Sequence, residues 1–130
     1  MISQNVRLAV AAAVVVFAAP AFAAPSQSYT SQAFRATQAR GQPILVDAHA
    51  DWCPTCRAQA PTIEAVSKDA TFGRLVILKL DYDHQTQEKR DLGARQQSTL
   101  IAFSGARESA QATGITDPNV IRALAATALG

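Results

Sequence analysis

The 130-residue sequence contains only two cysteines, two histidines, one tryptophan and one methionine. A single disulfide between cysteines three residues apart closes a very short loop and constrains the unfolded chain little. The two cysteines are therefore poorly suited to stabilising a small domain. Lys and Arg (12) barely outnumber Asp and Glu (10), and no basic patch points to nucleic acid. The apolar run over residues 8–19 is shorter than the about 20 residues of a membrane-spanning helix.

The N-terminal segment has the pattern of a secretory signal peptide. Arg7 gives a weakly positive start, the apolar run follows, Pro20 breaks it, and Ala21-Phe22-Ala23 supplies a small-residue cleavage site. We therefore expect residues 1–23 to be removed as a signal peptide and residues 24–130 to form one exported domain in the periplasm. An uncleaved membrane anchor is the alternative.

Hydrophobic patterning beyond residue 30 alternates between helix and strand. Strands separated by helices predict parallel pairing, and the last two strands predict an antiparallel hairpin. The fold class is therefore α/β, with a mixed sheet of four to five strands and helices on both faces. The expected elements are a helix at 32–40 capped by Ser31, a strand at 44–50, a helix from Cys53 kinked at Pro61, a strand at 75–80, a helix at 85–95, a strand at 99–103, an edge strand at 108–113 and a helix from Pro118.

The inner faces of two helices can be assigned from the same spacing. The helix after Cys53 is expected to point Ala60, Ile63, Ala65 and Val66 inward. The last helix is expected to bury Val120, Ile121, Leu124 and Leu129, whereas residues 24–30 look like a polar lead-in.

The segment Trp52-Cys53-Pro54-Thr55-Cys56 places two thiols where a strand gives way to a helix. Unpaired N–H groups and the dipole at a helix N-terminus favour an anion, so the pKa of the Cys53 thiol should fall. A thiolate is the nucleophile of disulfide exchange, and Cys56 lies one turn on, where it can resolve a mixed disulfide. A structural bridge and half of a metal site are the alternatives, although zinc normally takes four ligands.

Around this motif the chain resembles the thioredoxin family over about residues 31–129. The resemblance implies a thioredoxin fold and a thiol–disulfide oxidoreductase without a bound cofactor, in which Cys53 attacks, Cys56 resolves and the two form a redox disulfide. The matching residues are Ile44-Leu45-Val46-Asp47, Ala50 to Arg57, Ala60-Pro61, Lys79 with Asp81, Phe103-Ser104-Gly105 and Gly114.

Supporting roles follow from the same resemblance. Asp47 corresponds to a buried acid beneath the second cysteine, and burial raises a carboxyl pKa, which makes it a usable base. Lys79 falls where a lysine approaches that acid, Trp52 where an aromatic packs beside the disulfide, and Pro61 at the family's helix kink.

Two positions depart from the family pattern. With Thr99 aligned to the start of the family's strand, Ser98 stands where the family has a cis-proline, which packs against the disulfide in a loop that receives substrate. A cis bond before a non-proline residue costs about 2.5–4 kcal/mol. The bond before Ser98 can therefore be either trans or a strained cis bond. His49 replaces an aromatic two residues after Asp47, on the same strand face. A protonated His49 near Cys53 would lower the thiol pKa further, and a neutral space-filling role is equally open.

Protein thiols and disulfides are the expected partners, together with a membrane electron donor or acceptor. The chain itself is expected to be a monomer. Strong oxidants of the family carry His between the cysteines, and Pro54-Thr55 lacks it, which favours a reductase. The alternative class is a metal-binding or metal-delivery module that uses Cys53, Cys56 and His49; a redox-inert adaptor is a third.

Overall fold

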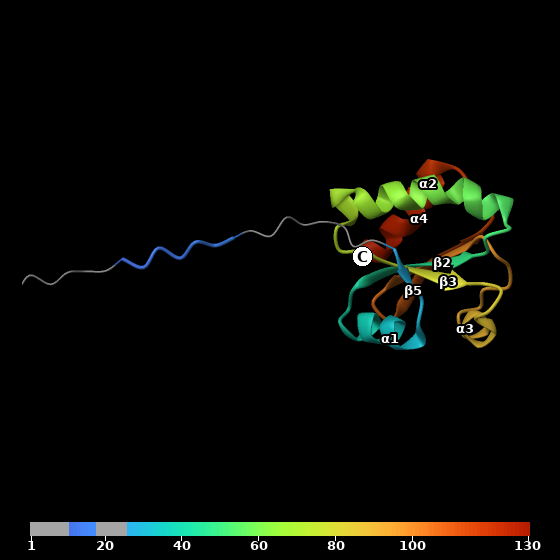
Figure 1. Cartoon of the computed structure of the whole chain (residues 1–130), viewed down its shortest axis with the longest axis horizontal. Helices are drawn as coiled ribbons and strands as arrows, with labels where there is room; N and C mark the ends of the chain where they lie inside the picture. Colours follow the sequence, from blue (N-terminus) through green and yellow to red (C-terminus); the bar gives the residue numbers. More distant parts are fainter. Residues whose placement is uncertain (1–10, 18–25) are drawn as a thin grey trace, which may run out of the picture.

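Residues 26–130 fold into three layers, with a five-stranded sheet between two layers of helices (Figure 1). The structure is a computed structural model that describes residues 11–17 and 26–130. The predicted signal peptide, residues 1–23, lies mostly outside these ranges and stays a prediction. Within the described ranges, no helix has the length and apolar character needed to cross a bilayer.

The order of helices and strands follows the predicted order, with one additional strand at the start. The elements are β1 (Gln27–Ser28), α1 (Ser31–Ala39), β2 (Pro43–His49), α2 (Pro54–Lys68), a 3-10 turn (Ala70–Phe72), β3 (Val76–Asp81), α3 (Thr86–Asp91), β4 (Thr99–Ser104), β5 (Arg107–Thr113), α4 (Pro118–Ala126) and a second 3-10 turn (Thr127–Leu129).

The strands are arranged in the order β1-β3-β2-β4-β5, so β2 is the central strand. The pairing of β2 with β3 is parallel, as predicted, and β4 and β5 form the predicted antiparallel hairpin. The expectation that β4 is also parallel is wrong, because β4 runs antiparallel to β2. A helix between two strands does not by itself fix their relative direction.

Side chains of β2 alternate between two apolar cores. Ile44, Val46 and Ala48 belong to the core that includes Phe103, and Figure 1 shows α1 and α3 on that side. Leu45 belongs to the other core, together with residues of α2 and α4. Asp47 shares the Leu45 face of the strand, so the predicted acid lies on the side of the helix that carries the cysteines.

Several details differ from the sequence-based expectations. Residues 27–28 form β1, because their backbone pairs in parallel with Leu78 and Lys79 of β3. Thr30 caps α1 in place of Ser31, since its hydroxyl accepts a hydrogen bond from the Ala33 N–H at 3.0 Å.

The predicted helix faces also need correction. Ala60 and Ala65 are exposed, and α2 instead buries Cys56, Gln59, Thr62, Ile63 and Val66. Val120 is 48% exposed, while Ile121, Leu124 and Ala125 fill the inner face of α4.

Candidate functional site

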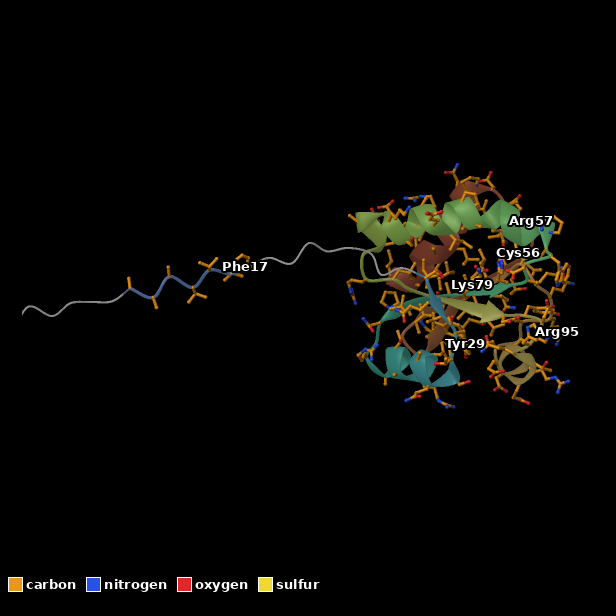
Figure 2. The ribbon with its side chains drawn as sticks, viewed as in Figure 1. Phe17, Tyr29, Cys56, Arg57, Lys79 and Arg95 are labelled. Carbon is orange, nitrogen blue, oxygen red and sulfur yellow. A yellow bond between two sulfur atoms is a disulfide. The ribbon has the colours of Figure 1, made fainter. Side chains whose placement is uncertain are left out.

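Cys53 and Cys56 form a disulfide at the N-terminal end of α2 (Figure 2 labels Cys56). Cys53 is the N-cap residue, and its sulfur accepts a hydrogen bond from the backbone N–H of Cys56 at 3.0 Å. Pro54 occupies the first turn, where its missing N–H costs no helix hydrogen bond. The same N–H and the helix dipole would stabilise a thiolate at Cys53 after reduction.

The disulfide is enclosed in this oxidised form. Each cysteine is only 1% exposed, and Ala50 and Tyr82 pack against the pair. An incoming thiol therefore reaches the sulfur of Cys53 only when neighbouring side chains move. No sequence motif singles out Tyr82, whose hydroxyl donates to the Arg95 carbonyl at 2.9 Å.

Trp52 lies directly before the disulfide and is 56% exposed. Its indole N–H donates to a carboxylate oxygen of Asp83 at 2.9 Å, which fixes the ring against the loop after β3. The exposed ring thus lies on the surface immediately before Cys53 in the chain.

Asp47 is a buried acid, as expected, with 6% of its surface exposed. Its Oδ1 atom has no hydrogen-bond partner among the described residues. Burial raises the pKa of the Asp47 carboxyl above its ordinary value of 3.8, while the charges of His49 and Lys79 act in the opposite direction. Such a carboxyl can accept and return a proton nearer to neutral pH than an exposed one can.

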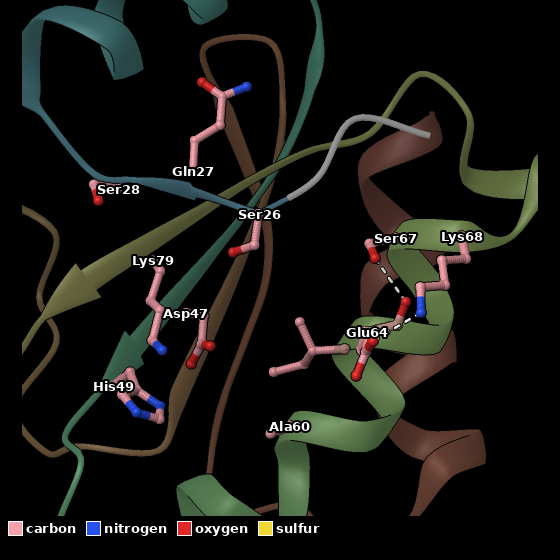
Figure 3. A pocket seen from close by; sticks show the side chains of 11 residues that line it. Ser26, Gln27, Ser28, Asp47, His49, Ala60, Glu64, Ser67, Lys68 and Lys79 are labelled. Atoms are coloured by element: carbon pink, nitrogen blue, oxygen red, sulfur yellow. Dashed lines mark hydrogen bonds and ion pairs between the residues drawn. The ribbon is translucent and has the colours of Figure 1, made fainter. Parts of the chain in front are cut away.

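His49 and Lys79 line a pocket of about 490 Å³ together with Asp47 (Figure 3). Lys79 pairs with Asp47 in the parallel register of β2 and β3, which places it next to the acid as expected, although Lys79 itself is exposed. His49 is half-buried, and its Nε2 lies 3.0 Å from a carboxylate oxygen of the exposed Asp51. The charge of His49 acts on Asp47, whereas its expected effect on Cys53 stays a prediction.

Ser98 adopts an unusual backbone conformation with φ of 58°. The described residues contain no cis peptide bond, so the bond before Ser98 is trans. The Ser98 N–H donates to the Ala48 carbonyl at 2.8 Å, and Thr99 is fully buried with its hydroxyl 2.8 Å from that of Thr113. The turn before β4 therefore differs in geometry from the cis-proline loop that the resemblance implies.

Two other predicted positions are accommodated within α2. Thr55 is half-buried between the cysteines, and Pro61 lies inside the helix, which continues to Lys68. One fully buried polar residue of this helix, Gln59, was not anticipated. Its position three residues after Cys56 was the only available signal.

Comparison with known proteins agrees with the fold and the motif. The family model described as Thioredoxin matches residues 25–127. The chain is 32% identical over 74 residues to a thioredoxin of Chlamydia muridarum, which covers 57% of this chain and 71% of that protein. It is 34% identical over 73 residues to a thioredoxin of Alicyclobacillus acidocaldarius, covering 56% of this chain and 69% of that one.

A solved structure, that of Trxlp from Edwardsiella tarda, is similar over most of the domain. Its TM-score is 0.74 at 32% sequence identity, covering 77% of this chain and 98% of that chain. A thioredoxin of Malassezia sympodialis has a TM-score of 0.72 at 22% identity, covering 82% of this chain and 96% of that chain, and shows likeness of fold. The thioredoxin fold is thus confirmed.

Replacing Asp47 with Asn should raise the free energy of unfolding at neutral pH. The folded chain holds the Asp47 proton more tightly than the unfolded chain, because burial raises the pKa. Stability therefore falls as pH rises from the unfolded to the folded pKa, and each pH unit between them is worth about 1.4 kcal/mol. Each kcal/mol shifts the melting midpoint of a domain this size by about 4–8 °C.

Thermal unfolding of both proteins between about pH 3 and pH 8 measures this effect. The midpoints should coincide at the acid end and separate as pH rises, with Asp47→Asn melting higher. Asp91→Asn is the matched control, because Asp91 is exposed at the end of α3 and its charge does not act on Asp47, so its loss should change stability little. A midpoint for Asp47→Asn that falls below the parent at pH 8 would contradict the argument.

Proposed function

The chain belongs to the thioredoxin family, and from this premise we propose that it is a periplasmic enzyme that mainly reduces disulfides of protein substrates. Thiol–disulfide oxidoreductase activity follows from the family and from the CxxC disulfide. Periplasmic location and reductive direction are the parts that need separate tests. The observation that carries the proposal is the disulfide at the N-terminus of α2, where the sulfur of Cys53 already accepts a backbone hydrogen bond.

In the proposed first step, the thiolate of reduced Cys53 attacks one sulfur of a substrate disulfide. A bond forms between Cys53 and that sulfur, the substrate S–S bond breaks, and the released substrate thiolate takes a proton from water. The product is a mixed disulfide. The N–H of Cys56 stabilises the attacking thiolate, because it already points at the sulfur of Cys53.

In the second step, Cys56 loses its proton and attacks the sulfur of Cys53. The mixed disulfide breaks, the second substrate thiol is released, and the chain ends as the Cys53–Cys56 disulfide. Two electrons have then moved from the chain to the substrate. We assign Asp47 as the acceptor of the Cys56 proton, since its carboxyl is buried on the sheet face that α2 covers and has a raised pKa.

Serine substitutions separate the two thiols. Cys53→Ser should abolish reduction of insulin by the mature protein, down to the uncatalysed rate, because no attacking sulfur remains. Cys56→Ser should still attack but not resolve, so it should accumulate a mixed disulfide that mass spectrometry detects and a reductant removes. Retained turnover in Cys53→Ser would contradict the assignment.

The reductive direction rests on the residues between the cysteines. Strong oxidants of the family carry His between the cysteines, and Pro54 and Thr55 lack the imidazole that would stabilise the reduced thiolate. Equilibration with glutathione buffers should therefore give a potential nearer to about −270 mV, as for thioredoxin, than to about −120 mV, as for a strong oxidant. A value near the second figure would reverse the proposed direction.

A periplasmic reductase needs a source of electrons, and we propose a membrane protein that presents a dithiol. Reduction of the Cys53–Cys56 disulfide by that dithiol restores the starting state. We expect the chain to work as a monomer. The metal-delivery alternative is not favoured, because the two sulfurs are bonded to each other and the matched relatives are thioredoxins.

Export is proposed from the N-terminal pattern of Arg7, the apolar run and the Ala21-Phe22-Ala23 site. When the full chain is expressed in a bacterium with two membranes, the periplasmic fraction should contain a protein that begins at Ala24, as mass spectrometry would show. Ala23→Arg should block cleavage and leave the precursor, whereas Ser26→Arg, beyond the cut, should be processed normally. Cytoplasmic recovery of the uncleaved parent would contradict export.

A further inference from the structure

Gln59 is a fully buried polar side chain on the helix that carries both cysteines. It lies one turn after Cys56, on the inner face of α2. Buried glutamine is unusual, and its amide normally needs partners for both the N–H₂ and the carbonyl group. The contacts it makes therefore indicate why it is there.

The side-chain nitrogen of Gln59 joins two backbone segments that are far apart in sequence. It donates to the carbonyl of Ser98 at 3.2 Å and to the carbonyl of Ile115 at 2.8 Å. One segment is the turn before β4, and the other is the loop after β5. The amide thus connects α2 to both segments at one end of the sheet.

The conformation of Ser98 requires such support. Its φ of 58° lies in the left-handed region, which a non-glycine residue keeps only when its surroundings enforce it. Three hydrogen bonds hold it: its N–H donates to Ala48, and its carbonyl accepts from the N–H of Gly114 at 3.0 Å and from Gln59. Only the bond from Gln59 comes from a side chain.

Core packing alone does not explain the glutamine. The carbonyl oxygen of its side chain is buried and has no hydrogen-bond partner among the described residues. A leucine of similar volume would fill the space without burying that oxygen. The two donated hydrogen bonds are what a leucine would lose.

The turn that contains Ser98 lies beside the end of β2 from which the chain continues to Cys53. Ala48, which accepts its N–H, lies on β2 just before the chain turns toward Cys53. Ser98 itself is only 5% exposed, but the preceding Gln96 and Gln97 are exposed and half-exposed. Their direction depends on the backbone angle at Ser98, and a protein that approaches Cys53 would meet them.

We propose that Gln59 is a positioning residue for disulfide exchange: its amide clamps the turn at Ser98 in the left-handed conformation, so that the turn can receive a protein substrate beside Cys53. The proposal rests on the proposed function, because it concerns how a protein disulfide docks at that site.

Hydrogen exchange tests the clamp without any assay of activity. In the oxidised mature protein, Gln59→Leu should increase amide exchange of Ser98 and Gly114 about fivefold, the effect of losing one hydrogen bond. Gln38→Leu is the matched control, because the Gln38 amide donates to the Gly105 carbonyl at the other end of β4. Unchanged exchange at Ser98 and Gly114 would overturn the clamp, and Gln59→Met, also without donors, repeats the test should the leucine variant fold poorly.

Kinetics test the consequence for substrate docking. Gln59→Leu should raise the KM for insulin about fivefold, while kcat and the rate of alkylation of reduced Cys53 by iodoacetamide stay within about twofold. Gln38→Leu should change none of these. An unchanged KM, or an equal loss in alkylation, would overturn the positioning role, whereas a parent protein that cannot reduce insulin would show that the proposed function itself is wrong.

Discussion

Strand β2 is hydrogen-bonded on both edges, and this pairing determines where the cysteines and Asp47 lie. β2 pairs with β3 along one edge and β4 along the other, and its side chains from Ile44 to Ala48 are buried. Because strand side chains alternate, the register that buries Leu45 on the α2 side must also bury Asp47 there. The same strand ends at His49 and delivers Cys53 to the start of α2.

Two electrostatic features of opposite kind result from this arrangement. At Cys53, backbone N–H groups and the helix dipole favour a negative charge. At Asp47, burial disfavours it, and the nearby charges of His49 and Lys79 offset the cost only in part. A carboxyl that can accept a proton at higher pH than an exposed one and a sulfur that gives one up are the pair that exchange chemistry requires.

The sequence specified those parts of the fold in which side-chain pattern and local chemistry agree. The central strands, α2 and the hairpin β4–β5 could be predicted because apolar spacing determines them. β1 could not be predicted, since its two residues join the sheet through their backbone and carry no apolar signal. The antiparallel direction of β4 could not be predicted either, because it depends on the end of the sheet at which the chain re-enters after α3.

The site was predictable to the extent that residue type alone reveals chemistry. Cys53, Cys56 and Asp47 are distinctive in type and place, whereas Gln59 resembles any polar residue of an exposed helix face. The positive φ of Ser98 is also invisible in sequence, because serine is not a residue that marks a left-handed turn.

The unsatisfied polar atoms of the core are concentrated where the chemistry is. Among the described residues, the buried side-chain oxygens and nitrogens without a hydrogen-bond partner are Oδ1 of Asp47 and Oε1 of Gln59. One projects from the sheet face that α2 covers, and the other from the inner face of α2, near the disulfide. Each costs stability that an apolar residue would avoid. The charges of His49 and Lys79 act on Asp47, and the Gln59 amide donates to Ser98, so both buried oxygens belong to residues to which we assign roles in the exchange reaction.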